Sequence, residues 1–304
     1  MLRKLILASL ALFIIGFAAF WLLTQPETVE ARTLGPHKPD IENGRTMFFA
    51  GGCASCHATP AQSDATRLGG GLPLRSPFGT FYVPNISPHP RDGIGGWNEA
   101  QFVTAMVKGT SPAGEHYYPA FPYTSYQRMR MDDLRDLFAF MKTLPAVEGR
   151  ARGHDLPFPF NVRRGLGLWK LLYLDGAPFR PDPQQSAEWN RGAYLVNGPG
   201  HCAECHSARN LLGGIRPATR FAGGPHLEGE GWVPNITQQA LKDWPAGDIE
   251  EVLTSGVLPN GDTVGSNMAP VVRSLSQIPA EDRRAMAAYI KSLPPVPSPP
   301  RPGR

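Results

Sequence analysis

The sequence predicts a mainly α-helical protein with an N-terminal transmembrane helix followed by two similar helical halves. One long apolar run occupies residues 5–23, and two sets of matching motifs follow it. In both sets the apolar residues have helical spacing, and a repeated pattern of this kind indicates repeated structural units. After the apolar run, the 304-residue chain is long enough for two domains of ordinary size.

We expect five segments along the chain. They are a membrane anchor with a short linker (1–32), a first domain (33–148), an interdomain strap (149–185), a second domain (186–294) and a disordered Pro-rich tail (295–304).

The N-terminal segment has the length and flanking charges of a membrane span. Only Ser9 and Gly16 interrupt its apolar run, which is long enough to cross a bilayer. Arg3 and Lys4 precede the run, so the positive-inside rule leaves the N-terminus in the cytoplasm. The remaining chain is then expected in the periplasm of a bacterium, attached to the inner membrane. A cleaved signal peptide is the alternative, because small residues occur at 17–19.

Two pentapeptides contain all four cysteines of the chain. They are Cys53-Ala54-Ser55-Cys56-His57 and Cys202-Ala203-Glu204-Cys205-His206. C-x-x-C-H is the attachment motif of c-type haem, in which both thiols form thioethers with the haem vinyl groups and the histidine binds the iron. The sequence therefore predicts two covalently bound haem c groups, one in each half.

Paired cysteines have two other common uses. Four thiolates can hold one structural zinc ion, and a single C-x-x-C pair can act as a redox-active dithiol. Neither use accounts for a histidine at the same place after both pairs, so we favour haem.

The two halves also share their expected helices. An amphipathic helix is expected before Gly109 and another before Gly256, and each glycine lies twelve residues after a tryptophan. Glycine just past the last periodic residue is a helix stop signal. A second helix ends each half at Lys-Thr-Leu-Pro (142–145) and Lys-Ser-Leu-Pro (291–294), where proline halts it.

A further pair of matching segments is Val83-Pro84-Asn85-Ile86-Ser87 and Val233-Pro234-Asn235-Ile236-Thr237. The order of these motifs resembles the class I cytochrome c domain, in which an attachment motif near an N-terminal helix is followed by a Pro-Asn segment, a distal methionine and a C-terminal helix. The resemblance implies two such domains in tandem. It also implies that the carbonyl groups of Pro84 and Pro234 orient His57 and His206. Prolines that only turn a loop are the alternative.

The chain is similar to dihaem c-type cytochromes related to the cytochrome subunits of bacterial membrane-bound alcohol dehydrogenases. The similarity covers residues 40–148 and 186–294. Those subunits generally carry three haems, whereas this chain has motifs for two.

The expected distal ligand of the second haem is Met268, in a loop twelve residues after Gly256. A thioether sulfur at this position raises the reduction potential. Twelve residues after Gly109 stands Phe121, which cannot bind iron, although related alcohol dehydrogenase cytochromes generally have methionine at this place. The first haem therefore has a different distal ligand or none.

Three alternatives remain open for that position. Met129 lies eight residues after Phe121 but aligns with Ile278, a hydrophobic position before the last helix. His116 aligns with Thr263 and is less suitable than Met129. The third alternative is an empty distal site.

The segment 149–185 belongs to neither half. Its apolar stretch at 166–174 follows Arg163 and Arg164, a composition that suits a membrane surface or a groove on a partner. We favour a strap packed between the domains, because such a linker holds two cofactors at a fixed distance.

Electron transfer is the function that these features predict. The resemblance implies a role between a periplasmic dehydrogenase, of quinoprotein, flavoprotein or molybdenum type, and a quinone, a soluble cytochrome or a terminal oxidase. The sequence has no nucleotide-binding fingerprint, so primary substrate oxidation is expected in another protein. The alternative is a peroxidase-like haem enzyme with an open distal site at haem 1. Four haem propionates would offset the formal charge of +4, so we expect no nucleic-acid partner.

Overall fold

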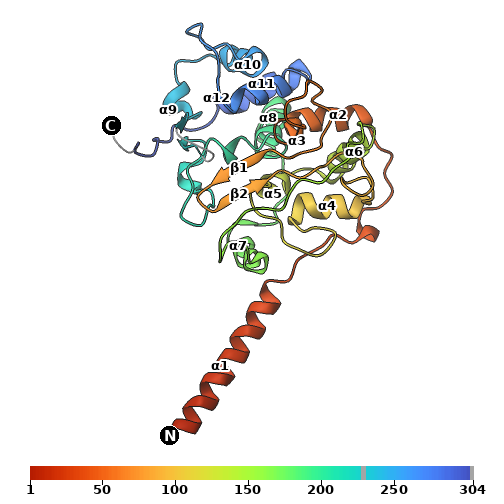
Figure 1. The fold of residues 1–304 in the computed structure, drawn as a ribbon. Helices are drawn as coiled ribbons and strands as arrows, with labels where there is room; N and C mark the ends of the chain where they lie inside the picture. The colour runs from red at the N-terminus through yellow and green to blue at the C-terminus, as the bar shows by residue number, and fades with distance from the viewer. Residues whose placement is uncertain (227–230, 302–304) are drawn as a thin grey trace.

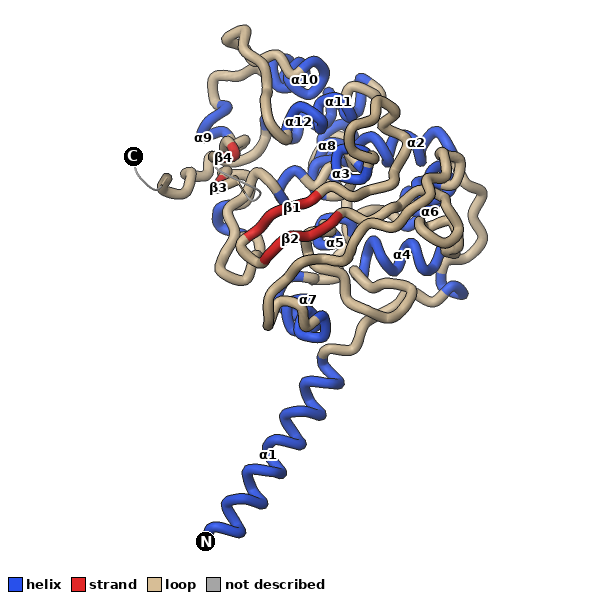
Figure 2. Tube along the Cα trace, in the orientation of Figure 1, coloured by secondary structure: helices blue, strands red, loops and turns tan. Residues whose placement is uncertain are grey.

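The computed structural model describes residues 1–226 and 231–301. The fold is mainly helical, with two short antiparallel hairpins (Figure 2). Helix α1 (Leu2–Leu23) projects from the compact body that the rest of the chain forms (Figure 1). Two halves of the body share the order first helix, attachment motif, hairpin, amphipathic helix and last helix, with a strap between them.

The first half contains α2 (Ile41–Ala50), α3 (Cys53–His57), β1 (Pro73–Ser76), β2 (Gly79–Tyr82), α4 (Glu99–Lys108), α5 (Tyr123–Tyr126) and α6 (Met131–Met141). The linker before it contains η1 (Ala31–Thr33), and the strap contains η2 (Arg163–Gly165) and α7 (Leu166–Tyr173). The second half contains α8 (Ala187–Asn197), η3 (Cys202–Glu204), η4 (Pro217–Thr219), β3 (Gly224–Pro225), β4 (Trp232–Val233), α9 (Gln238–Leu241), α10 (Ala246–Ser255), α11 (Met268–Leu275) and α12 (Ala280–Lys291).

In each half the first and last helices cross at a glycine. Helix α2 packs against α6, and α8 packs against α12. A Cβ atom on Gly44 would lie 2.1 Å from the carbonyl oxygen of Asp136, and one on Gly192 would lie 1.9 Å from that of Ala285. Only glycine lets two backbones approach so closely. The same helix crossing therefore occurs in both halves.

Both amphipathic helices predicted from the sequence are present, and they end as expected. A capping box between Asn98 and Gln101 starts α4. Gly109 ends α4 with a φ of 57°, and Gly256 ends α10 with a φ of 80°. Glycine adopts this left-handed conformation without the steric cost of a side chain.

A continuous hydrophobic core joins the two halves. Tyr194 of α8 lies at the junction, where its hydroxyl donates a hydrogen bond to Asp133 of α6. The guanidinium of Arg130 lies 5.1 Å from the centre of the Tyr194 ring. Helix α11 of the second half contacts α2 and α3 of the first. The two attachment motifs are therefore held in a fixed relative position.

The strap contacts both halves. The backbone N–H of Phe179 donates to the carbonyl of Arg128 in the first half (3.1 Å). The indole of Trp169 donates to the carbonyl of Leu212 in the second half (2.8 Å). The ammonium of Lys170 donates to the last carbonyl of α4, on Lys108 (2.6 Å). Burial lowers the pKa of Lys170 to about 7.

The start of the tail, for which the sequence predicts disorder (295–304), hydrogen-bonds to the second half. The backbone N–H of Val296 donates to the hydroxyl of Thr237 (3.1 Å), and its carbonyl accepts from the amide of Asn235 (2.8 Å). The buried Asn235 amide requires hydrogen-bond acceptors, and the tail supplies them. Disorder of the remaining tail stays a prediction, and residues 302–304 lie outside the described part of the chain.

Helix α1 has 22 residues, a mean hydropathy of 2.6 and no buried residue. Within the described ranges it is the one helix long and apolar enough to cross a membrane. Cleaved signal sequences share this composition.

Candidate haem-binding sites

The first attachment motif forms a single helical turn. Gly52, with a φ of 56°, starts α3, so both thiols and His57 lie within that turn. Nδ1 of His57 donates to the carbonyl of Pro84 (2.9 Å). Burial lowers the pKa of His57 to about 4, so the imidazole is neutral at pH 7. Its Nε2 lone pair is then available to a metal.

The second motif has the same arrangement. The backbone N–H of His206 donates to the carbonyl of Cys202 (2.9 Å), which closes one turn. Nδ1 of His206 donates to the carbonyl of Pro234 (2.8 Å), and burial lowers the pKa of His206. The structure therefore brings together both proline–histidine pairs that the resemblance implied.

The side chains of each motif fit covalent haem c, because two thiols and one imidazole lie close together in a short turn. Burial raises the pKa of Cys53 to about 12 and that of Cys202 to about 12, so both are thiols at pH 7. A thioether forms when such an S–H group adds across a vinyl group. Among the described residues, no three His, Cys, Asp or Glu side chains gather into a metal-binding group.

Backbone hydrogen bonds confirm the register predicted between the two distal turns. The N–H of Tyr117 donates to the glycine carbonyl that ends α4 (2.7 Å), and the N–H of Val264 donates to the one that ends α10 (2.9 Å). Four residues further on, Phe121 and Met268 occupy the same place in the two halves.

The two residues at this place have different surroundings. Met268 is half-buried against the core, and it is the first residue of α11 instead of a loop residue as predicted. Phe121 lies among tyrosines, with ring-centre distances of 5.7 Å to Tyr117, 6.3 Å to Tyr123 and 5.5 Å to Tyr126.

Neither alternative residue lies in the distal turn's ligand position. Met129 is 3% exposed and occupies the place of Ile278, just before the last helix of its half. It faces the second half, because a Cβ atom on Gly198 would lie 3.6 Å from its Cγ. Nε2 of His116 donates to the carbonyl of Thr24 at the end of α1 (2.9 Å).

Comparison with known proteins identifies the family. The Cytochrome c family matches residues 41–145. The diheme cytochrome c-type protein of Cereibacter sphaeroides is 49% identical over 297 residues, which are 97% of this chain and 99% of the relative. The chain belongs to the dihaem c-type cytochromes.

The cytochrome also matches parts of longer proteins. One is the alcohol dehydrogenase (quinone) cytochrome c subunit of Gluconacetobacter polyoxogenes, with 35% identity over 292 residues. The matched region covers 92% of the cytochrome and 61% of that relative. Another is the fructose dehydrogenase cytochrome subunit of Gluconobacter japonicus, with 33% identity over 273 residues. The matched region covers 88% of the cytochrome and 55% of that relative. The predicted relationship to alcohol dehydrogenase cytochromes is confirmed. The cytochrome is an electron-transfer protein that binds haem c.

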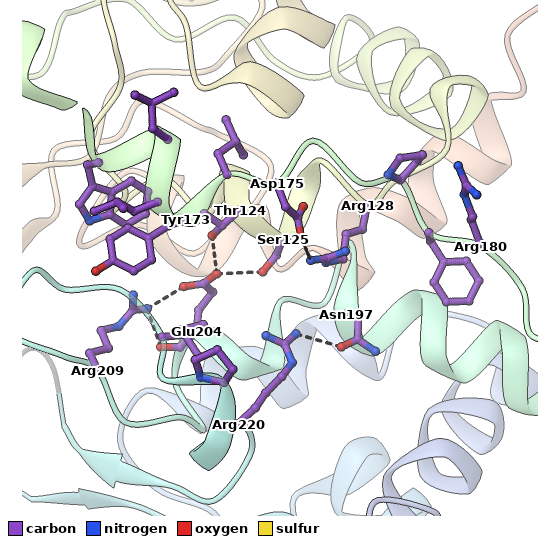
Figure 3. A pocket seen from close by; sticks show the side chains of 18 residues that line it. Thr124, Ser125, Arg128, Tyr173, Asp175, Arg180, Asn197, Glu204, Arg209 and Arg220 are labelled. Atoms are coloured by element: carbon purple, nitrogen blue, oxygen red, sulfur yellow. Dashed lines mark hydrogen bonds and ion pairs between the residues drawn. The ribbon is translucent and has the colours of Figure 1, made fainter. Parts of the chain in front are cut away.

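A buried carboxylate joins the two halves of the cytochrome at the second motif (Figure 3). Glu204 accepts hydrogen bonds from Thr124 (2.8 Å) and Ser125 (2.9 Å) of α5, and it pairs with Arg209 (2.6 Å). Burial opposes ionisation, but the Arg209 charge and these hydrogen bonds lower the pKa of Glu204. A cavity of about 670 Å³ adjoins it, bordered also by the strap and Arg220.

His201 connects the peptides that precede the two motifs. Its Nε2 donates to the carbonyl of Gly51 (3.2 Å), and its ring packs edge-on against Tyr126 (5.6 Å between centres). Neither Glu204 nor His201 is predicted as a site residue from the sequence. The signal in the sequence is that each is a polar residue inside or beside an attachment motif. The partners Thr124, Ser125 and Gly51 belong to the other half, so the contacts could not be read from the motif itself.

Proposed function

We propose that this cytochrome is anchored in the bacterial inner membrane by α1 and carries two haem c groups in the periplasm, in two tandem class I cytochrome c domains (33–148 and 186–294). The observation that carries the proposal is the repeated bond from motif histidine to proline carbonyl, 2.9 Å in one half and 2.8 Å in the other. Two equivalent bonds support two haem sites with the same proximal arrangement.

In this proposal the cytochrome passes electrons from a periplasmic dehydrogenase to the respiratory chain, as a separate carrier or as a subunit of the dehydrogenase. The names of its relatives support a dehydrogenase as electron donor. A quinone, a soluble cytochrome or a terminal oxidase is the acceptor.

Each motif residue has a distinct role. Bound haem supplies reversible one-electron storage at its iron. His57 and His206 are the proposed proximal ligands, and the carbonyl groups of Pro84 and Pro234 fix their rings and raise their basicity. Met268 is the proposed distal ligand of haem 2. The proposed attachment residues are Cys53, Cys56, Cys202 and Cys205.

At haem 1 we propose that the chain provides no distal ligand. Phe121 occupies the ligand's place, Met129 is held between the halves, and His116 is held at the end of α1. Peroxide chemistry needs an acid–base group close to the reacting atoms. The turn around Phe121 instead consists of packed aromatic side chains. These surroundings support electron transfer over the peroxidase-like alternative.

Contacts at the end of α1 fix the proposed anchor to the body. Thr24 is fully buried, and its hydroxyl accepts a hydrogen bond from Nε of Arg164 (2.8 Å). The Arg164 guanidinium also lies 4.2 Å from the centre of the Trp21 ring. The body thus binds the last turn of α1, so the proposed span leaves the body at a fixed point.

Two measurements test the proposal. After a carbonate wash, we expect the haem-staining protein to remain in the membrane pellet, and its release would overturn the anchor. The purified full chain should contain two haems that resist acid–acetone extraction, and one haem per chain would overturn the two-site assignment. Conversion of His206 to Ala should remove the low-spin signal of the second site only, while the chain keeps both thioether-bound groups.

A further inference from the structure

Helix α7 leaves an apolar surface exposed at the base of the body. Leu168, Leu171 and Leu172 are 44%, 60% and 66% exposed. Leu211 and Leu212 are 93% and 57% exposed, on the turn that accepts the Trp169 hydrogen bond. We call these five leucines the α7 patch. Large exposed apolar patches mark contact with a membrane or another protein.

The α7 patch is fixed to the last turn of α1. A Cβ atom on Gly167 would lie 2.5 Å from Cβ of Thr24, so the two backbones are in close contact. Leu23 and Leu171 border the same hollow of about 280 Å³. Figure 1 shows α7 at the edge of the body from which α1 leaves. The patch therefore lies level with the end of the proposed membrane span.

The opposite side of α7 is bound to the body, so the helix cannot turn to bury its leucines. Lys170 donates to the carbonyl groups of Lys108 (2.6 Å) and Gly109 (2.8 Å). The Tyr173 hydroxyl accepts a hydrogen bond from the Asn210 amide (2.9 Å). These bonds keep the amphipathic helix in one rotation, with its leucine side outward.

We propose that the α7 patch rests in the periplasmic leaflet of the inner membrane and is occupied by phospholipid. This inference rests on the proposed anchor. A helix with leucines on one side and cationic residues at its end has the composition of an interfacial helix. Arg163 starts this segment with a side chain 34% exposed, and Trp21 stands on α1 at the depth where interfacial tryptophans gather.

Phospholipid is the occupant that the anchor favours over a partner protein. If α1 spans the bilayer, the contacts of Thr24 with Gly167 and Arg164 hold α7 at the headgroup level. A protein partner would have to enter between the body and the bilayer. With two attachments, α1 and the α7 patch, the body is held in one orientation on the membrane.

Nitroxide accessibility in the full-length holoprotein tests the proposal. The protein is reconstituted into vesicles of phosphatidylethanolamine and phosphatidylglycerol, with a label on Leu171→Cys. Collisions with oxygen report lipid, and collisions with a water-soluble nickel chelate report water. Leu12→Cys in α1 is the lipid reference. Val257→Cys is the water reference, since its residue is 39% exposed and follows α10, far from α1 (Figure 1).

We expect the Leu171→Cys label to match the Leu12→Cys label, with frequent oxygen collisions and few nickel collisions. Nickel collisions as frequent as at Val257→Cys would place the patch in water and overturn the proposal. Rare collisions with both reagents would show burial against a second copy and would also overturn it. If the Leu12→Cys label itself reports water, the anchor has failed, and the α7 inference fails with it. Leu172→Cys provides an independent second position.

Discussion

One side chain distinguishes two distal turns whose backbones match. A methionine thioether has lone pairs that bind iron, whereas the phenyl ring of Phe121 has none and packs with Tyr117, Tyr123 and Tyr126. Because the hydrogen bonds of both turns coincide, we expect this position to determine how the two proposed haem sites differ in distal ligation.

Substitution of Met268 by alanine should lower the midpoint potential of haem 2. Loss of the thioether removes a ligand that favours the reduced iron, and axial ligands together span roughly 0.8 V of potential. A spectroelectrochemical titration of the holoprotein measures the change. Met131→Ala is the control, because Met131 is 38% exposed at the start of α6. An unchanged titration would show that Met268 is not the ligand.

The reverse change, Phe121→Met, should give haem 1 the ligand set of haem 2. The side chain would start from the same place in the turn as that of Met268. We expect a gain in the near-infrared charge-transfer band of methionine-bound ferric haem and a rise in the haem 1 potential. An unchanged spectrum would mean that position 121 does not face the iron.

His201→Asn should slow electron exchange between the two haems. The substitution shortens the side chain and breaks the bond to the Gly51 carbonyl, while asparagine tolerates the φ of 37° at this position. Flash photolysis with an external photoreductant measures the rate, and a redox titration checks that both potentials are retained. His37→Asn is the control, because His37 pairs with Asp136 at the start of α2, the end of that helix opposite the first motif. An unaltered rate would contradict a bridging role for His201.

At the scale of elements, the glycine crossings make the helix pairs sensitive to one added methyl group. Gly44→Ala should destabilise the α2–α6 pair by about 1–3 kcal/mol, the usual range for overpacking. Hydrogen exchange of the amides in α2 and α6 measures the effect in the holoprotein. A loss of protection confined to other helices would contradict this reading.

Gly247→Ala is the matched control for that experiment. Gly247 lies in α10, and a Cβ atom added there would meet nothing within 4 Å. Alanine in an exposed helix position is more favourable than glycine by about 1 kcal/mol. The same substitution should therefore increase protection in α10 and decrease it in α2.

The sequence predicted the elements that depend on local signals. Helices α4 and α10, their glycine stops, and the C-terminal helices follow from spacing and from glycine or proline signals. The β1–β2 hairpin was not predicted, because it has four-residue strands and is extended by pairing of Thr80 with Asp155 in the strap. Gly44 stands nine residues before Cys53, and Gly192 stands ten residues before Cys202. This similar spacing acquires a meaning only in the structure, where each glycine is the point at which two helices cross.

The tail and the interface residues depended on distant partners. Asn235 binds Val296, and in the first half Asn85 binds the carbonyl of Val147 (2.7 Å). The Pro-rich composition of the tail gives no sign of the hydrogen bonds that Val296 makes to Asn235 and Thr237. Glu204 and His201 likewise acquire their partners only when the halves pack.

At the scale of the whole molecule, the two haem sites should differ in spin state. The oxidised full-length protein should give one low-spin signal, from the site of Met268, and one high-spin signal, from the site of Phe121. Electron paramagnetic resonance distinguishes the two. Two low-spin signals would mean that another residue binds haem 1, and Met129 would have to leave the core position in which it is 3% exposed.

Packing between the halves also has a consequence for biogenesis. Helix α11 of the second half contacts the first attachment turn, α3, and α5 of the first half supplies Thr124 and Ser125 to Glu204 in the second motif. If the chain is exported as proposed, the first motif stays uncovered until some two hundred further residues have followed it. Enzymes that attach haem would then have longer access to the first site than to the second, and closure of the interface would end that access for both sites together.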